Sequence, residues 1–283
     1  MPPVSFDRAA ACYDETRGYT EGSADRIRAA IVAHTGAGTT MRFLDLGVGT
    51  GRIALPFIRA GYDYTGVDIA QAMMDRLAAK LAVDPGATDY RYRLRQADIT
   101  NLPFADESFD VIITVHVLHL VEDWRRALRE ARRVLRRPGG WLLIGHDAAA
   151  GESRLADEEP IPAPAQVRIK WLEIRRELGA DKPAGRSNIW VNDGRLVAYL
   201  QELGATTQTV QLAGYERPPI SARAMVERLR ARVYSSDWAM PDDIHAEALR
   251  RLERWLAETG LPLDEPATMT GEFMAITGSW NSD

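Results

Sequence analysis

Residues 41–147 alternate short apolar stretches with segments in which apolar residues recur every three or four positions. Strands that alternate with helices in this way predict a parallel sheet covered by helices. The expected strands are 43–46, 62–67, 90–95, 110–115 and 141–145. Stretch 90–95 carries an arginine at every second position, which suits a solvated sheet edge. Stretch 110–115 is almost continuously apolar, which suits a strand buried on both faces.

A glycine-rich turn, Gly47-Val48-Gly49-Thr50-Gly51, lies between the first expected strand and a helix expected over 52–60. Glycines let a ligand approach the backbone, and the start of a helix offers free N–H groups. Asp68 closes the second strand, where a carboxylate can accept both hydroxyls of an adenosine ribose. Asp98 follows the third strand, where it can accept from an adenine amino group. Each feature alone also fits a tight turn or a helix cap, but the three together favour a nucleoside site.

Two ligand classes suit such a turn, and Asp45 helps to choose between them. Asp45 lies two residues before the first glycine, where a carboxylate would repel the pyrophosphate of a dinucleotide and attract an ammonium group. The dinucleotide pattern also places its third glycine three residues after the second, whereas Gly51 follows Gly49 by two. The residues therefore favour a sulfonium ligand, S-adenosylmethionine, and leave a nicotinamide cofactor as the alternative.

Four ordered motifs in residues 5–147 resemble class I S-adenosylmethionine-dependent methyltransferases. The resemblance is to the branch that includes ubiquinone and menaquinone C-methyltransferases and many small-molecule methyltransferases. The motifs are Leu44-Asp45-Leu46-Gly47-Val48-Gly49-Thr50-Gly51-Arg52, Val67-Asp68-Ile69-Ala70-Gln71-Ala72-Met73-Met74, Ala97-Asp98-Ile99 with the following Leu102-Pro103-Phe104 and Ser108-Phe109-Asp110-Val111-Ile112, and Arg132-Arg133-Val134-Leu135-Arg136-Arg137-Pro138-Gly139-Gly140. Relatives often have serine at the position of Ala70, so a helix cap is expected to be missing there.

The resemblance implies S-adenosylmethionine as the cofactor and assigns a role to each contact. The glycines would pass under its methionine part, with Asp45 near the ammonium and Asp68 on the ribose. Ile69 and Met73 would pack on the adenine, whose edge Asp98 would read together with a backbone group. The implied contacts are Tyr13, Arg17, Asp45, Gly47, Gly49, Gly51, Asp68, Ile69, Met73, Asp98, Ile99 and Val115.

Residues 6–17 resemble the leading helix of this family, which folds over the cofactor. Tyr13 and Arg17 lie at helical spacing, and Arg17 is placed to pair with the methionine carboxylate of the cofactor. An arginine that faces solvent is the alternative reading of Arg17.

After residue 150 the pattern changes to an acidic, proline-rich stretch, amphipathic helices and two further strands, 206–215 and 268–277. The expected fold is α/β, a Rossmann-like seven-stranded, mostly parallel sheet with helices on both faces and a helical lid. The expected parts are cofactor-covering helices at 1–40, a cofactor-binding core at 41–150, lid insertions at 151–192 and 218–266, and completion of the core by 193–217 and 267–283.

Methyl transfer is an in-line displacement, in which the protein aligns nucleophile and methyl group and excludes water. A base of near-neutral pKa helps when the nucleophile must lose a proton. His116 follows the fourth expected strand and His146 follows the fifth, so both are candidate catalytic residues at the carboxyl edge of the sheet. Packing or cofactor contact is the alternative for His116 and for the neighbouring His119. No group of His, Asp and Glu has metal-ligand spacing, so no metal is expected.

Composition limits the partners. The net charge is -5 and no basic stripe is visible, so the expected acceptor is a small molecule and not a nucleic acid. The longest apolar run, 111–121, is too short to span a bilayer, no secretory signal is visible, and the single Cys12 suits a reducing compartment, so a cytoplasmic protein without membrane attachment is expected. Two rival functions stay open, a nicotinamide-dependent oxidoreductase and a cofactor-binding regulator without turnover.

Overall fold

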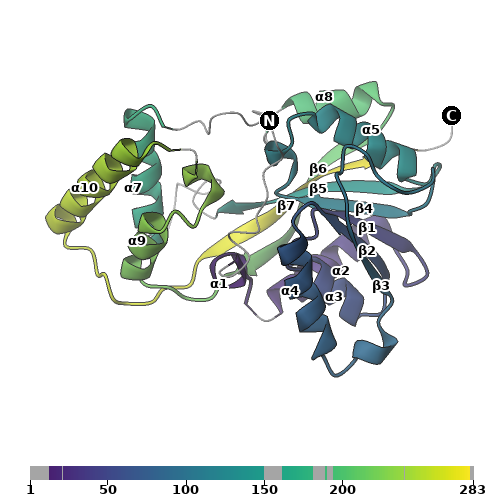
Figure 1. Cartoon of the computed structure of the whole chain (residues 1–283), viewed down its shortest axis with the longest axis horizontal. Coiled ribbons are helices and arrows are strands. Elements are labelled where there is room, and N and C mark those ends of the chain that lie inside the picture. The colour runs from purple at the N-terminus through teal and green to yellow at the C-terminus, as the bar shows by residue number, and fades with distance from the viewer. Residues whose placement is uncertain are drawn as a thin grey trace. The chain divides into compact units, whose positions relative to one another are not determined.

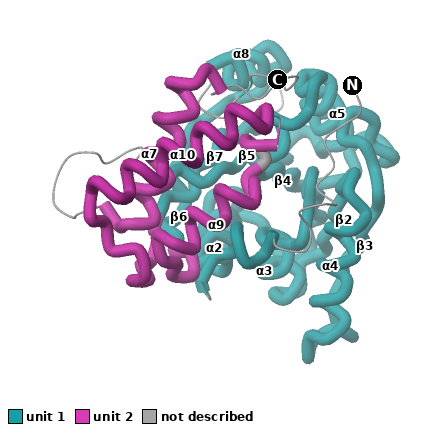
Figure 2. Tube along the Cα trace, turned by 60° about the vertical axis from the view of Figure 1, so that its left-hand side comes forward, with its two compact units in different colours: residues 1–149, 186–215, 271–283 teal, residues 150–185, 216–270 magenta. Residues whose placement is uncertain are grey.

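The protein is represented by a computed structural model that describes residues 13–20, 22–149, 161–180, 189, 194–238 and 240–280. The chain forms two compact units (Figure 2). The first contains residues 1–149, 186–215 and 271–283, and the second contains residues 150–185 and 216–270. Cys12, the first part of the expected leading helix and most of the acidic, proline-rich stretch lie outside the described residues.

The first unit is built on a seven-stranded sheet with the order β3-β2-β1-β4-β5-β7-β6. Strands β1 to β5 pair in parallel, and β7 runs antiparallel to β5. The strands are β1 Arg42–Leu46, β2 Asp63–Asp68, β3 Tyr92–Gln96, β4 Val111–Val115, β5 Trp141–Ala149, β6 Thr206–Glu216 and β7 Thr270–Ser279. The expected fold class is confirmed, with the arginine-bearing β3 at an edge and the apolar β4 buried at the centre.

Helices cover both faces of this sheet (Figure 1). One face is covered by α2 Ser23–Thr35, α3 Ala54–Arg59 and α4 Gln71–Ala82, whose apolar residues form one core cluster with the strands. The other face is covered by α5 Trp124–Val134 and α8 Gly194–Glu202. Pro56 is tolerated in α3 because it occupies the first turn, where a backbone N–H has no intrahelical partner. Short helices are α1 Tyr13–Arg17, η2 Ala87–Asp89 and η3 Leu118–Leu120.

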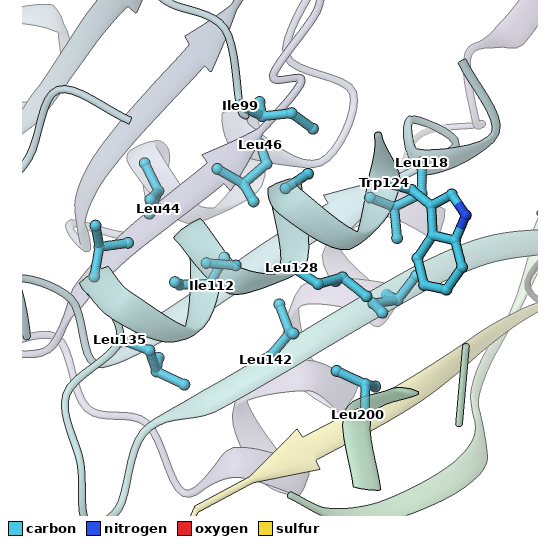
Figure 3. Packing of buried hydrophobic residues seen from close by; sticks show 14 of the residues in the cluster. Leu44, Leu46, Ile99, Ile112, Leu118, Trp124, Leu128, Leu135, Leu142 and Leu200 are labelled. Atoms are coloured by element: carbon cyan, nitrogen blue, oxygen red, sulfur yellow. The ribbon is translucent and has the colours of Figure 1, made fainter. Parts of the chain in front are cut away.

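Helix α5 shows how the sequence pattern is converted into packing. Its apolar stripe, with Trp124 and Leu128, lies on the sheet beside Leu142 of β5 (Figure 3). The arginines at 125, 126 and 129 are exposed, as expected for the opposite face of an amphipathic helix. Asp123 caps the N-terminus of the helix, because its side chain accepts from the backbone N–H of Arg126 at 2.9 Å.

Strand β5 is longer than expected, and this changes the place of His146. The sequence predicts a strand that ends at Gly145, but β5 continues to Ala149 because β7 pairs with it at nine positions, from Trp141 with Ser279 to Ala149 with Gly271. The expectation that His146 follows the strand is therefore wrong, since His146 lies within β5 opposite Met274. Side chains alternate along a strand, so His146 and Asp147 point to opposite faces of the sheet.

The second unit is helical and has its own core. Its helices are α7 Ala163–Glu177, α9 Ala222–Arg230, η4 Ser235–Asp237 and α10 Asp242–Thr259. Trp171 is fully buried, and its indole N–H donates to Asp237 at 3.3 Å. Asp237 also pairs with Arg175 at 3.2 Å, and both side chains are buried. That this unit acts as a lid stays a prediction.

The strand order reverses between β1 and β4. In open α/β sheets, ligands bind beyond the carboxyl ends of the strands at such a switch point. The glycine turn follows β1 and His116 follows β4, so the fold places two predicted site segments next to each other.

Candidate active site

The three glycines of the turn after β1 adopt positive φ angles, 87° at Gly47, 55° at Gly49 and 86° at Gly51. A Cβ at Gly47 would collide with Val117, and one at Gly51 would collide with the side chain of Leu77. At Gly49 the nearest side-chain atom is the Met73 methyl carbon, at an ordinary contact distance of 3.5 Å. Two of the glycines are therefore required by close packing, and the third lies beside Met73 with space around it.

Asp68, at the carboxyl end of β2, is connected to this turn. Its Oδ2 accepts from the backbone N–H of Gly49 and its Oδ1 accepts from that of Ala70, both at 2.9 Å. Ala70 precedes α4 without a side-chain cap, and Asp68 holds the backbone of Ala70 at the start of this helix. These two bonds fix the Asp68 carboxylate between the glycine turn and the start of α4.

Asp45 is buried in the strand before the turn, with 3% of its surface exposed. Its Oδ2 accepts from the Tyr64 hydroxyl at 3.0 Å. Burial raises the pKa of Asp45 to about 7; the Tyr64 hydrogen bond opposes this rise, and the negative charge of Asp68 adds to it. Among the described residues, no basic side chain contributes to this pKa. The turn therefore carries a buried carboxyl group that a cation beside it would ionise.

The raised pKa of Asp45 makes a prediction about stability. The folded state holds a proton that the unfolded chain releases, because the pKa is about 7 when folded and 3.8 otherwise. The stability that Asp45 contributes is complete below about pH 4 and is lost as the pH rises towards about 7, at roughly 1.4 kcal/mol per pH unit. In Asp45→Asn this loss is absent. Urea unfolding at pH 5, 6 and 7 measures the free energy of unfolding of both proteins. The wild type should lose about 1 kcal/mol per pH unit relative to Asp45→Asn. Parallel pH dependences of the two proteins would contradict the prediction.

The expected adenine side of the site contains a small apolar cluster. Met73, 3% exposed, and Ala70 form its buried part, and Tyr13 of α1 packs against them. Ile99 is buried, whereas Asp98 is exposed and its Oδ1 accepts from the N–H and the hydroxyl of Thr100, both at 2.8 Å. The structure thus brings Tyr13 and Met73 together, and it places Asp98 in a turn of its own.

A contact that the sequence analysis missed connects α1 to the glycine turn. The Thr50 hydroxyl donates to Asp14 Oδ1 at 2.6 Å, and Lys80 Nζ pairs with Asp14 Oδ2 at 2.7 Å. Lys80 also donates to the Thr50 carbonyl at 2.7 Å. The position of Thr50 between two glycines is the one feature of the sequence from which such a partner could have been predicted. These bonds hold the leading helix against the turn.

A second missed group surrounds Asp147, near the carboxyl end of β5. Its carboxylate accepts from Arg52 at 2.7 Å and from the Tyr19 hydroxyl at 2.6 Å. The Arg52 guanidinium lies 4.6 Å from the centre of the Tyr19 ring and donates to the Arg17 carbonyl at 3.2 Å. The side chains of Arg52 and Asp147 are 11% and 5% exposed. This buried ion pair joins the residue after the glycine turn to β5 and to the segment after α1.

The two candidate catalytic histidines differ in their surroundings. His116 has a φ of 57°, and its Nε2 accepts from the backbone N–H of Asp147 at 3.0 Å. Burial lowers the pKa of His116; Asp147 opposes this, and the charges of Arg52 and Arg17 add to it. Burial also lowers the pKa of His146, whose buried Nδ1 has no hydrogen-bond partner among the described residues.

Residues 44–144, from β1 to β5, match the family described as a methyltransferase domain. This stretch contains the glycine turn, Asp45, Asp68 and His116. The chain carries a class I S-adenosylmethionine-dependent methyltransferase domain. The family that the sequence motifs resemble is thus confirmed for this methyltransferase domain.

Two curated relatives and one solved structure define what the methyltransferase domain is similar to. The uncharacterized methyltransferase YcgJ of Bacillus subtilis is 37% identical over 107 residues, 38% of this chain and 41% of the relative. A malonyl-[acyl-carrier protein] O-methyltransferase of Pectobacterium atrosepticum is 32% identical over 152 residues, 54% of this chain and 55% of the relative. The crystal structure of YcgJ has a TM-score of 0.56 at 19% identity and covers 91% of this chain and 99% of its own. The chain thus spans about half the length of the curated relatives it matches.

The described part of the protein contains neither a metal-binding cluster nor a helix able to span a membrane. No three His, Cys, Asp or Glu side chains lie together there in a way that would hold a metal ion. None of the helices in that part is long and apolar enough to cross a bilayer.

Proposed function

We propose that the protein transfers a methyl group from S-adenosylmethionine to a small organic acceptor. The observation that carries this proposal is the buried carboxyl group of Asp45 beside the glycine turn, with a pKa raised to about 7. Such a group suits a ligand that brings an ammonium and a sulfonium, and it would repel the pyrophosphate of a nicotinamide dinucleotide. The residues around the turn therefore fit the methyl donor better than the rival cofactor.

The other residues of the site support the same cofactor. The Asp68 carboxylate ends β2 beside the glycine turn, where it suits a ribose, and the apolar cluster of Met73 and Tyr13 suits an adenine ring. Arg17 is proposed to bind the methionine carboxylate. The proposed cofactor contacts are Tyr13, Arg17, Asp45, Gly47, Gly49, Gly51, Asp68, Ile69, Met73, Asp98, Ile99 and Val115.

The chemistry of the bound cofactor is a displacement, in which the acceptor's lone pair forms the new bond to the methyl carbon as the carbon–sulfur bond breaks and its electron pair stays on sulfur. The protein's residues bind, orient and exclude water. His116 is the proposed contact for the acceptor because it follows β4 at the switch point. His146 is the second candidate. Its side chain points to the face of the sheet opposite to that of Asp147, whereas His116 is bonded to the backbone of Asp147.

The acceptor is proposed to be a small molecule and not a nucleic acid. The net charge of -5 provides little of the electrostatic attraction that phosphate backbones require. A single cysteine suits a reducing compartment, so we place the activity in the cytoplasm.

Calorimetry with S-adenosylhomocysteine tests the proposal directly. The wild type is expected to bind it, and Asp68→Ala is expected to weaken binding by about 1–3 kcal/mol, roughly 5- to 150-fold, through lost hydrogen bonds. Asp63→Ala is the matched control, because Asp63 begins the same strand and forms an ion pair at 2.9 Å with the exposed Arg93. The affinity of this variant should stay within about twofold of the wild type.

Three results would argue against the proposal or part of it. Binding of the reduced nicotinamide dinucleotide without S-adenosylhomocysteine would favour the oxidoreductase. Wild-type affinity in Asp68→Ala would overturn the ribose assignment. Binding without transfer of a labelled methyl group to any metabolite fraction would favour a regulator without turnover.

A further inference from the structure

The hydrogen bond of His116 determines which ring nitrogen carries its proton. Nε2 lies 3.0 Å from the backbone nitrogen of Asp147, whose N–H is directed at Nε2. A backbone N–H can only donate, so Nε2 must present its lone pair. The Asp147 carboxylate oxygen is farther away, at 3.5 Å, beyond the usual range for a hydrogen bond that Nε2 would donate.

A neutral imidazole has one N–H group, so an accepting Nε2 places the proton on Nδ1. The neutral form is favoured because burial lowers the pKa of His116 and the charges of Arg52 and Arg17 lower it further, against the opposing effect of Asp147. His116 therefore has no lone pair left on the ring to take a proton from a substrate.

The other edge of the His116 ring is not used by a hydrogen bond within the described residues. The side chain of His116 is 33% exposed, and Nδ1 has no hydrogen bond to any residue that the structure describes. Val117, the next residue, packs against Gly47 of the turn. His116 thus belongs to the segment that packs on the glycine turn.

We infer that His116 is a hydrogen-bond donor to the methyl acceptor, and that the acceptor presents an anionic oxygen, as a carboxylate, phenolate or enolate does. This inference rests on the proposed function and narrows its substrate class. An N–H donor makes its strongest hydrogen bonds with a charged acceptor, so an anionic oxygen suits this side of the ring best. Asp147 is a positioning residue here, because its backbone N–H fixes the tautomer.

The tautomer can be observed without a substrate. Long-range proton–nitrogen spectra of the full chain labelled with ¹⁵N-histidine report whether each ring nitrogen is protonated, and His116→Asn identifies which of the five histidines is His116. At pH 7 we expect Nε2 of His116 to be unprotonated and Nδ1 to carry the proton. A proton on Nε2, or on both nitrogens, would overturn the inference.

The acceptor class is tested with simple probes on the protein saturated with S-adenosylhomocysteine. Benzoate is expected to bind more tightly than benzylamine. Asparagine and aspartate both tolerate the positive φ at this position, and only asparagine offers an N–H near the place of Nδ1. His116→Asn should therefore keep benzoate affinity within about threefold, and His116→Asp should lose about tenfold or more. Benzoate that binds no better than benzylamine, or equally well to His116→Asp, contradicts the inference.

The outcome is separable from that of the proposed function. His116 is not among the proposed cofactor contacts, so all variants should bind S-adenosylhomocysteine as the wild type does. Failure of that binding in the wild type would count against the function itself. Intact binding with the wrong tautomer or probe preference would count only against the role of His116.

Discussion

Replacing Gly49 by alanine is expected to leave the protein folded and to weaken S-adenosylhomocysteine binding by about 100-fold or more. The added methyl group meets Met73 at an ordinary contact distance, 3.5 Å from its methyl carbon, so the fold has room for it. The positive φ of 55° costs about 1–2 kcal/mol in a residue with a Cβ. The methyl group does, however, fill space beside Met73, which we propose packs on the adenine, and a well-packed site cannot absorb it.

Gly61→Ala is the matched control for this variant. Gly61 has a φ of 82°, ends the turn after α3, and has nothing within 4 Å of an added Cβ. It should show the same loss of thermal stability as Gly49→Ala but unchanged cofactor affinity by calorimetry. Gly47→Ala should do more damage than either, because its Cβ collides with Val117. Equal affinities in Gly49→Ala and Gly61→Ala would show that the cofactor does not pass over Gly49.

Arg52→Ala is expected to lower the free energy of unfolding by about 3–5 kcal/mol, the usual cost of leaving a buried charge without its partner. The side chain of Asp147 is 5% exposed and would keep the hydrogen bond from the Tyr19 hydroxyl, but it would lose its cationic partner. The cation over the Tyr19 ring would also be lost. Urea unfolding monitored by tryptophan fluorescence measures the change.

The control is Arg59→Ala, which removes an ion pair of similar length at the surface. Arg59 pairs with Asp84 at 2.6 Å, but its side chain is 54% exposed, so the loss should be below about 1 kcal/mol. A double variant, Arg52→Met with Asp147→Leu, should recover most of the stability, because no buried charge remains. A cost in Arg52→Ala no larger than that in Arg59→Ala would mean that the Asp147 group contributes little to the fold.

Local patterns were enough to predict most of the sheet and the position of the glycine turn. Strands β1 to β4 lie close to their expected ranges, since each depends on its own apolar run and the turn residues beside it. Strand β5 was expected to end at Gly145 and extends to Ala149. The reason is its partner: β7 comes from more than a hundred residues farther along the chain and pairs across all nine positions.

The same distinction separates the predicted site residues from the missed ones. Asp45 lies within β1 and Asp68 ends β2, so a local motif was enough to find both. The missed group depends on contacts between distant residues: Asp147 is 95 residues from Arg52 and 128 residues from Tyr19 in the sequence. The protonation of Asp45 and the tautomer of His116 depend on burial and on a single backbone bond, which no spacing pattern encodes.

The buried carboxyl group of Asp45 links the cofactor to the acidity of the medium. With a pKa of about 7, this group is about half protonated near neutrality, so the proton competes with the cationic ligand for the same site. By thermodynamic reciprocity, binding the proposed cofactor expels that proton, and raising the proton concentration weakens the cofactor's hold. Acidification is therefore expected to weaken binding of the proposed cofactor through one side chain in the strand that precedes the turn.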